Sequence, residues 1–154
     1  MSIKDQKKAV IPAICQGARM LPATKAVPKE LLPVYDRPII EHVAKEAIEG
    51  GITKIILVTR SGKDAIENHF DARYELEHRL EKKGKETILG TVKDTIPANV
   101  TVTSVRHSDA LDELLKRDGL NAVETDAGIF DCGNKQGFLS ANLPVGMRDP
   151  VGIQ

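Results

Sequence analysis

The chain has 154 residues, a length that suggests one domain with a core of its own. Lysine plus arginine and aspartate plus glutamate number 22 each, so the chain has neither the basic excess typical of nucleic-acid binding nor an acidic solvating tail. Aromatic residues make up only 3% and tryptophan is absent, which predicts a core of aliphatic side chains.

The cysteines and the apolar runs bear on the compartment. Cys15 and Cys132 do not form a CxxC pair and follow no secretory signal. No apolar run approaches the ~20 residues of a membrane span. We therefore expect a cytoplasmic protein with neither a membrane nor a nucleic acid as partner.

Strand and helix patterns alternate in the first part of the chain. The compact apolar run KKAVIPAI, residues 7–14, predicts a buried strand. IIEHVAKEAIEGG, residues 39–51, has apolar side chains at helical spacing and ends on a glycine pair that suits a helix C-terminus. ITKIILVTR, residues 52–60, predicts a second buried strand because it is rich in β-branched residues.

The alternation continues to residue 106. The charged, amphipathic stretch from Lys63 to about Glu86 predicts one long helix, Pro97 breaks the next segment, and residues 99–106 predict a third strand. This order builds a parallel sheet with covering helices, so we expect an α/β fold over residues 1–106. Ligands of such sheets bind at the loops beyond the carboxyl ends of the strands.

The pattern is less regular after residue 106. Ser108 suits the N-cap of a helix over residues 109–119. Residues 121–125 and 128–131 are short strand candidates, and residues 134–147 predict a weaker helix that Pro144 interrupts. We expect the tail, residues 148–154, to be loose.

The loop after the first strand has features of a phosphate site. Phosphate loops need glycine because backbone N–H groups must approach the anion closely, and Gly17 is the one glycine between that strand and Arg19. In one interpretation the loop holds a polyphosphate that Arg19, Lys25 and Lys29 neutralise. In the other it is a plain strand exit with solvated cations. The GxxxxGKS motif of P-loop proteins is absent.

Four segments of the sequence carry a family resemblance. They are residues 17–52 (GARMLPATKAVPKELLPVYDRPIIEHVAKEAIEGGI), 55–71 (IILVTRSGKDAIENHFD), 74–80 (YELEHRL) and 130–142 (FDCGNKQGFLSAN). Together they resemble the bacterial UTP–glucose-1-phosphate uridylyltransferases over most of residues 7–148. The resemblance implies a Rossmann-like parallel sheet of the sugar-nucleotidyltransferase type in a three-layer α/β/α arrangement. It also implies the conversion of UTP and glucose 1-phosphate to UDP-glucose and pyrophosphate with Mg²⁺.

The same resemblance implies roles for individual residues. Arg19, against the leaving pyrophosphate, and Lys29, near the phosphates, correspond to catalytic positions. Asp131 corresponds to one of two aspartates that hold Mg²⁺. The nucleotide-binding positions are Ala13, Gly17, Lys25 and Glu30.

The loop departs from the family pattern. Where the family reads AAGxGTR, residues 13–19 read AICQGAR, so Cys15 replaces a glycine and Ala18 a threonine. A side chain at position 15 costs roughly 1 kcal/mol or more if the backbone there needs a positive φ. We expect Cys15 to be buried or neutral rather than reactive.

A second departure concerns the middle of the chain. The resemblance implies a long central region, with the first metal aspartate and most sugar-binding residues, that has no counterpart between His107 and Ser108. We expect one domain, residues 1–154, in which a nucleotide-binding part, 1–107, joins the family's C-terminal segment, 108–154, directly. Bare strand edges and apolar faces would favour a homo-oligomer.

The shortening leaves three hypotheses for function. The first is a uridylyltransferase whose turnover is weak or lost, because Asp131 alone is a weak Mg²⁺ site unless phosphates bring the ion. The second is a non-catalytic remnant that binds nucleotide weakly or associates with an identical or full-length subunit. The third is a dimeric scaffold without a ligand.

Other polar residues give weaker signals. Asp126 and Asp131 flank a turn and could form a metal pair, although the resemblance favours Asp131 alone. The histidines have no metal-ligand spacing and are expected at the surface or partly buried, mostly on helices; they are His42, His69, His78 and His107.

Overall fold

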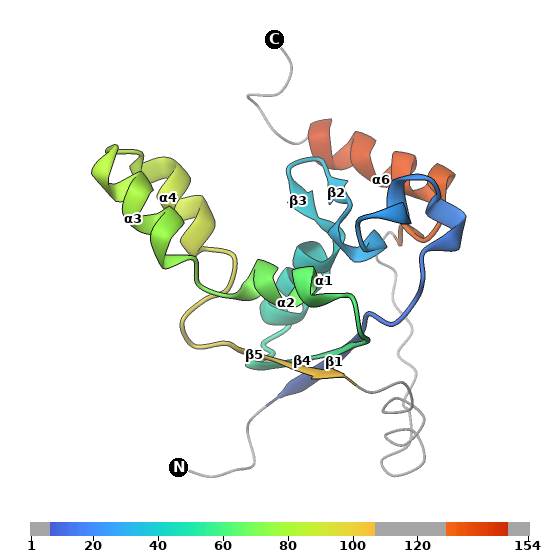
Figure 1. The fold of residues 1–154 in the computed structure, drawn as a ribbon, viewed down its shortest axis with the longest axis horizontal. Coiled ribbons are helices and arrows are strands. Elements are labelled where there is room, and N and C mark those ends of the chain that lie inside the picture. Colours follow the sequence, from blue (N-terminus) through green and yellow to red (C-terminus); the bar gives the residue numbers. More distant parts are fainter. Residues whose placement is uncertain (1–6, 107–128, 148–154) are drawn as a thin grey trace.

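The computed structural model describes residues 7–106 and 129–147 (Figure 1). A parallel sheet of three strands in the order β1–β4–β5 lies along one side of these residues. The strands are β1 (Lys8–Pro12), β4 (Lys54–Thr59) and β5 (Thr101–Arg106). Each falls within a predicted strand, and both pairings with the central β4 are parallel, which confirms the α/β prediction.

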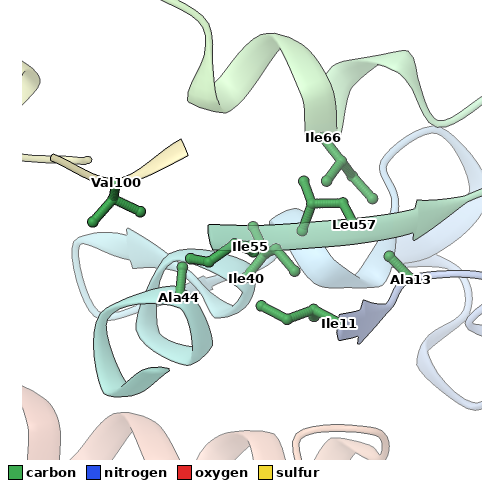
Figure 2. Close-up of a cluster of buried hydrophobic side chains, with 8 residues drawn as sticks. All are labelled: Ile11, Ala13, Ile40, Ala44, Ile55, Leu57, Ile66 and Val100. Carbon is green, nitrogen blue, oxygen red and sulfur yellow. The ribbon is translucent and has the colours of Figure 1, made fainter. Parts of the chain in front are cut away.

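The strand register gathers apolar side chains on one face of the sheet. Ile11 of β1 is paired with Leu57 of β4, and Ile55 of β4 is paired with Val102 of β5. Because side chains alternate between faces along a strand, these four residues share a face. Ile55 and Leu57 are fully buried there. The predicted aliphatic core therefore forms on this face (Figure 2).

Two helices bury this face. Helix α1 (Ile39–Glu49) contributes Ile40 and Ala44, and helix α2 (Asp64–Phe70) contributes Ile66, all fully or almost fully buried (Figure 2). Burying each large aliphatic side chain is worth about 1.5–3 kcal/mol. The packing of α1 and α2 on one face fixes the loops that connect them to the strands.

Helix α1 ends where the sequence predicts. The Gly50 N–H donates to the Glu46 carbonyl oxygen at 3.0 Å, and Gly51 has φ +82°. Glycine adopts this left-handed conformation without steric cost, so the glycine pair can end the helix and lead into β4.

The stretch from Lys63 to about Glu86 is helical, as predicted, but it is not one continuous helix. It contains α2 and α3 (Tyr74–Lys82), and α4 (Glu86–Lys93) begins at its end. Asp71 is extended after α2, and Gly84 takes φ +62° between α3 and α4. Helices α3 and α4 pack against each other and project from the body as a hairpin (Figure 1).

The segment between β1 and α1 is built from short elements. Three one-turn 3-10 helices, η2 (Ala18–Met20), η3 (Ala23–Lys25) and η4 (Lys29–Leu31), precede a ribbon of two short antiparallel strands, β2 (Pro33–Val34) and β3 (Arg37–Pro38). This segment lies beyond the carboxyl end of β1 (Figure 1).

The C-terminal segment returns to this ribbon. Helix α6 (Lys135–Met147) packs against β2 (Figure 1). The Tyr35 N–H donates to Asn142 Oδ1 at 2.7 Å. The helix predicted over residues 134–147 is thus confirmed, although Pro144 lies inside it. The strand candidate at residues 128–131 is wrong for residues 129–131, which form neither helix nor strand.

Several expectations lie outside the described residues: the Ser108 cap, the helix at 109–119, the strand at 121–125, Asp126, the junction at 107–108 and the tail. In the ranges that are described, the helices lie on the core side of the sheet (Figure 1). The third layer of the expected α/β/α arrangement is therefore not among them. No described helix is long and apolar enough to cross a membrane.

Candidate functional site

The first loop leaves the sheet at a buried position. The Ala13 side chain is fully buried, and its backbone N–H donates to the Val58 carbonyl oxygen at 2.8 Å. Because the side chain of Ala13 belongs to the core, only its backbone is available for the predicted contact with nucleotide.

Gly17 is held where no other residue fits well. It has φ +70° and precedes η2, which begins at Ala18. A Cβ on Gly17 would lie 3.1 Å from Thr24 Cγ2 and 3.2 Å from Lys29 Cβ. The Thr24 hydroxyl also donates to the Gly17 carbonyl oxygen at 2.8 Å. Both the backbone conformation and the lack of space therefore require glycine here.

The steric cost expected for a side chain at position 15 does not arise. Among described residues other than glycine, only Tyr35 has a positive φ, so the backbone at Cys15 accepts a side chain without left-handed strain. Of the two alternatives expected for Cys15, buried or neutral, the first is excluded because its side chain is exposed. The replacement of glycine thus adds a thiol to the surface of the loop.

Arg19 and Asp131 lie side by side although they come from opposite ends of the chain. Gly133 separates them: a Cβ on Gly133 would fall 2.8 Å from Asp131 Oδ1 and 2.9 Å from Arg19 Nη2. Any side chain at this position would push the two groups apart. The structure therefore brings the predicted metal ligand to the predicted pyrophosphate contact.

The Asp131 carboxylate is stabilised in its charged form. Hydrogen bonds from the Gly133 N–H at 2.9 Å and from Asn134 Nδ2 at 2.8 Å hold the pKa of Asp131 below its usual range. The positive charges of Arg19 and Lys29 lower the pKa further. Arg19, Lys29 and Asp131 are thus electrostatic neighbours.

The first turn of α6 fixes the Asp131 loop. Asn134 Oδ1 accepts the Gly137 N–H at 2.9 Å, as an N-cap residue does. A Cβ on Gly137 would lie 2.1 Å from the Asp131 carbonyl oxygen, so only glycine allows this approach. Asn134 and Gly137 were not predicted, although asparagine directly before a helix is a preferred N-cap residue.

Glu30 is engaged inside the protein. Both of its carboxylate oxygens accept hydrogen bonds from Lys63 Nζ, at 2.9 and 2.8 Å. The two residues are only 7% and 5% exposed, so this is a buried ion pair. Lys63 was expected only as the start of a helix, and its partner across 33 positions gives no local signal in the sequence.

Lys25 is not among the residues that these contacts bring together. Its side chain on η3 is exposed and forms no ion pair with a described residue. The neighbouring Thr24, not Lys25, makes the contact with Gly17. Its predicted part in nucleotide binding rests on charge alone.

A metal ion would find only part of its ligands here. The described residues contain no group of three or more His, Cys, Asp or Glu side chains that could hold a metal. Asp131 is exposed and offers one carboxylate, a ligand type that suits Mg²⁺. The donor set fits Mg²⁺ only if oxygen atoms of a bound phosphate and water complete the coordination.

The described histidines lie on helices and are exposed or partly buried, as expected. His42 Nε2 contacts the Val34 carbonyl oxygen at 3.1 Å, and His78 is exposed on α3. His69 Nε2 lies 3.0 Å from Glu41 Oε2. Burial alone would raise the pKa of Glu41, but hydrogen bonds from His69 and Arg37 outweigh it and lower the pKa to about 2.

This second cluster borders a separate cavity. The cavity, of about 820 Å³, lies between α1, α2 and the α3–α4 hairpin, and Glu41 and His69 are in its wall. Arg19, Lys29 and Asp131 do not line it. This cavity is therefore distinct from the cations beyond β1.

A parallel sheet with covering helices places this chain in the class of α/β proteins, whose ligands bind beyond the carboxyl ends of the strands. The nucleotidyl transferase family model matches residues 8–109. The chain belongs to the nucleotidyl transferase family. Asp131 and α6 lie outside the matched range.

Similar proteins refine this assignment. The chain is 55% identical over 100 residues to the UTP–glucose-1-phosphate uridylyltransferase of Escherichia coli (strain K12), which covers 65% of this chain and 33% of the relative. It is 52% identical over 103 residues to that of Haemophilus influenzae, covering 67% and 35%. The resemblance found in the sequence is confirmed. The chain spans about a third of the length of these relatives.

A solved structure agrees with both sequence comparisons. The UTP-bound UDP-glucose pyrophosphorylase (UGPase) from Acinetobacter baumannii superposes with a TM-score of 0.62 and 51% identity. The match covers 65% of this chain and 35% of that protein. The three-stranded sheet described here thus has the fold of part of a nucleotidyltransferase.

Proposed function

We propose that this chain is a shortened uridylyltransferase that binds UTP at the Gly17 loop and retains weak or no turnover. The observation that carries the proposal is the placement of Asp131 beside Arg19, with the charge of Lys29 near enough to act on the carboxylate. The uridine nucleotide is supported by the relatives, which are UTP–glucose-1-phosphate uridylyltransferases.

The residues suit phosphoryl chemistry that needs no covalent intermediate. The guanidinium of Arg19 and the ammonium of Lys29 would neutralise a polyphosphate, and the N–H groups around Gly17 can approach it closely. The family reaction is attack of the glucose 1-phosphate oxygen on the α-phosphorus, with pyrophosphate leaving on the Arg19 side. Mg²⁺, when bound at Asp131, would supply further positive charge to the phosphates.

We expect weak turnover because the resemblance assigns part of the active site to a region that this chain lacks. Most sugar-binding residues and the first metal aspartate belong to the central region that has no counterpart here. Without them glucose 1-phosphate is poorly aligned, and much of the several kcal/mol that proximity supplies is lost. We expect turnover well below about 1 s⁻¹.

A non-catalytic role is the second candidate. Helix α6 exposes apolar side chains one turn apart, and the loop before it exposes two more; these residues are Ile129, Phe130, Leu139, Leu143 and Met147. Such side chains favour association with an identical or a full-length subunit. The homo-oligomer and the cytoplasmic location remain part of this proposal.

UDP-glucose formation from UTP, glucose 1-phosphate and Mg²⁺ tests the proposal, with UTP binding measured in parallel. Arg19→Ala should abolish any product and weaken UTP binding. Arg79→Ala is the matched control, because Arg79 is exposed on α3 and pairs only with Glu75 among the described residues. Absence of UTP binding by the folded protein would refute a nucleotide site. Turnover of about 1 s⁻¹ or faster would refute the loss of activity.

A further inference from the structure

The buried pair of Lys63 and Glu30 joins the two loops that meet at the carboxyl end of the sheet. Glu30 lies in η4, after β1, and Lys63 lies after β4 and directly before α2. Strands β1 and β4 are neighbours in the sheet. The pair is therefore a cross-link between the first two ligand-binding loops that a parallel sheet offers.

Lys63 is well placed to act as a fixed anchor. Its carbonyl oxygen accepts the Ile66 N–H at 3.0 Å, and its own N–H donates to the Arg60 carbonyl oxygen at 3.3 Å. Ile66 is fully buried in the core. Because the Lys63 backbone is tied to the core through α2, the base of its side chain has a fixed position.

Glu30 links Lys63 to the neighbouring cation, Lys29. Lys29 and Glu30 share the single turn of η4, which the Leu31 N–H and Leu32 N–H close on the carbonyl oxygens of Pro28 and Lys29, at 2.9 and 3.1 Å. Fixing the carboxylate of Glu30 therefore fixes the turn that carries Lys29.

Lys29 in turn touches the glycine loop. A Cβ on Gly17 would meet Lys29 Cβ at 3.2 Å, so the backbone of the loop packs closely against the stem of Lys29. A displacement of η4 would change both the position of the Lys29 ammonium and the support of Gly17. The contacts run from Lys63 through Glu30 and Lys29 to Gly17.

We infer that Lys63 is a positioning residue of the nucleotide site: by holding both carboxylate oxygens of Glu30, it sets the place of Lys29 against Gly17. Lys63 itself is 5% exposed, and its ammonium group is bound to Glu30 rather than presented to solvent. The inference rests on the proposed function in so far as nucleotide binds at Gly17, Arg19 and Lys29.

A stabilising role alone explains this pair poorly. Taking two charges out of water costs several kcal/mol per ion, and apolar residues of similar volume often replace a buried pair without loss of stability. A pair retained only for stability would thus be replaceable. A pair that sets geometry would not be, because apolar side chains do not reproduce its directional hydrogen bonds.

The test compares Lys63→Met with Lys63→Arg, which keeps a cation able to bind Glu30 with two hydrogen bonds. Lys93→Met is the matched control, since it removes an exposed lysine that pairs with Glu81 at 3.2 Å on the hairpin. Lys63→Met/Glu30→Met, which leaves no unpaired buried charge, is used if Lys63→Met does not fold. Amide exchange at Leu31 and Leu32, the Gly17 amide chemical shift and UTP affinity are measured for each.

Lys63→Met, or the double variant, should speed exchange at Leu31 and Leu32 by roughly tenfold or more while amides of the sheet keep their protection. It should move the Gly17 resonance and weaken UTP binding by about tenfold or more, and Lys63→Arg should restore part of each. Unchanged exchange at η4, uniform loss of protection, or unchanged UTP affinity would overturn the inference. If the wild-type chain binds no UTP, the proposed function fails, and the η4 exchange and the Gly17 resonance alone decide the positioning role.

Discussion

Asn134 binds the Asp131 carboxylate through its amide nitrogen and caps helix α6 through its amide oxygen. Asn134 Nδ2 donates to Asp131 Oδ2 at 2.8 Å, and Asn134 Oδ1 accepts the Gly137 N–H at 2.9 Å. One side chain thus couples the start of a helix to the carboxylate that lies beside Arg19.

Asn134→Ala should therefore have two separate effects. Loss of the cap should lower the free energy of unfolding by about 1 kcal/mol. Loss of the hydrogen bond should raise the pKa of Asp131 toward its usual value, with the Gly133 N–H still holding part of the shift. Carboxyl resonances followed against pH by NMR measure the second effect. An unchanged pKa would show that Asn134 does not stabilise the carboxylate.

Two glycines with similar φ allow a controlled test of the loop. Gly17 has φ +70° with Thr24 and Lys29 in close contact, whereas Gly84 has φ +62° and nothing within 4 Å of an added Cβ. Both alanine variants pay the left-handed strain of about 1–2 kcal/mol. Gly17→Ala should cost measurably more, because its Cβ also meets two side chains, and it should weaken UTP binding while Gly84→Ala does not.

Chemical denaturation and UTP titration of the two variants check this prediction. Equal destabilisation would show that the Gly17 pocket relaxes freely around a methyl group. Unchanged UTP affinity in Gly17→Ala, in a chain that does bind UTP, would place the nucleotide elsewhere.

The Glu41 cluster should make the stability of the fold depend on acid pH. The pKa of Glu41 is about 2, against an ordinary value of 4.5, because hydrogen bonds from His69 and Arg37 outweigh the effect of burial. A group whose pKa is lowered by folding contributes fully above its unfolded pKa, and the contribution disappears as pH falls through the folded value. Stability should thus fall between about pH 4.5 and about pH 2.

Urea unfolding across this pH range measures the effect. Glu41→Gln should flatten the pH dependence, whereas Glu75→Gln should not, because the Glu75 side chain is 90% exposed in its pair with Arg79. Equal slopes in the wild type and Glu41→Gln would show that other carboxylates dominate the acid response.

The sheet and the first helix follow from local patterns in the sequence. Strands β1 and β4 are largely apolar runs, β5 alternates valine with polar residues, and α1 combines helical spacing with a terminal glycine pair, so short windows contain the signal for each. The division of the predicted long helix does not follow in this way. Residues 71–73 and 83–85 are mostly charged, as the exposed side of a helix would be, and Gly84 is the one local signal of a break among them.

The candidate site, too, could be predicted from the sequence only in part. The need for glycine at Gly17 could be anticipated from its place after a strand, but the approach of Asp131 to Arg19 depends on how α6 packs against β2. The spacing of residues along the chain does not predict that packing. Only the family resemblance suggested that Asp131 and Arg19 belong to one site. The burial of Lys63 with Glu30 was missed because lone charged residues are exposed far more often than buried.

The two thiols should react at different rates. Cys15 is exposed in the loop, whereas Cys132 is half-buried, and burial together with the charge of Asp131 raises the pKa of the Cys132 thiol. Because the thiolate is the reactive form, a thiol reagent at about pH 8 should modify Cys15 first. Cys15→Ala should remove the fast phase and Cys132→Ala the slow one. Added UTP should slow only the fast phase if nucleotide covers the loop, and a fast phase that persists in Cys15→Ala would show that Cys132 is the more reactive thiol.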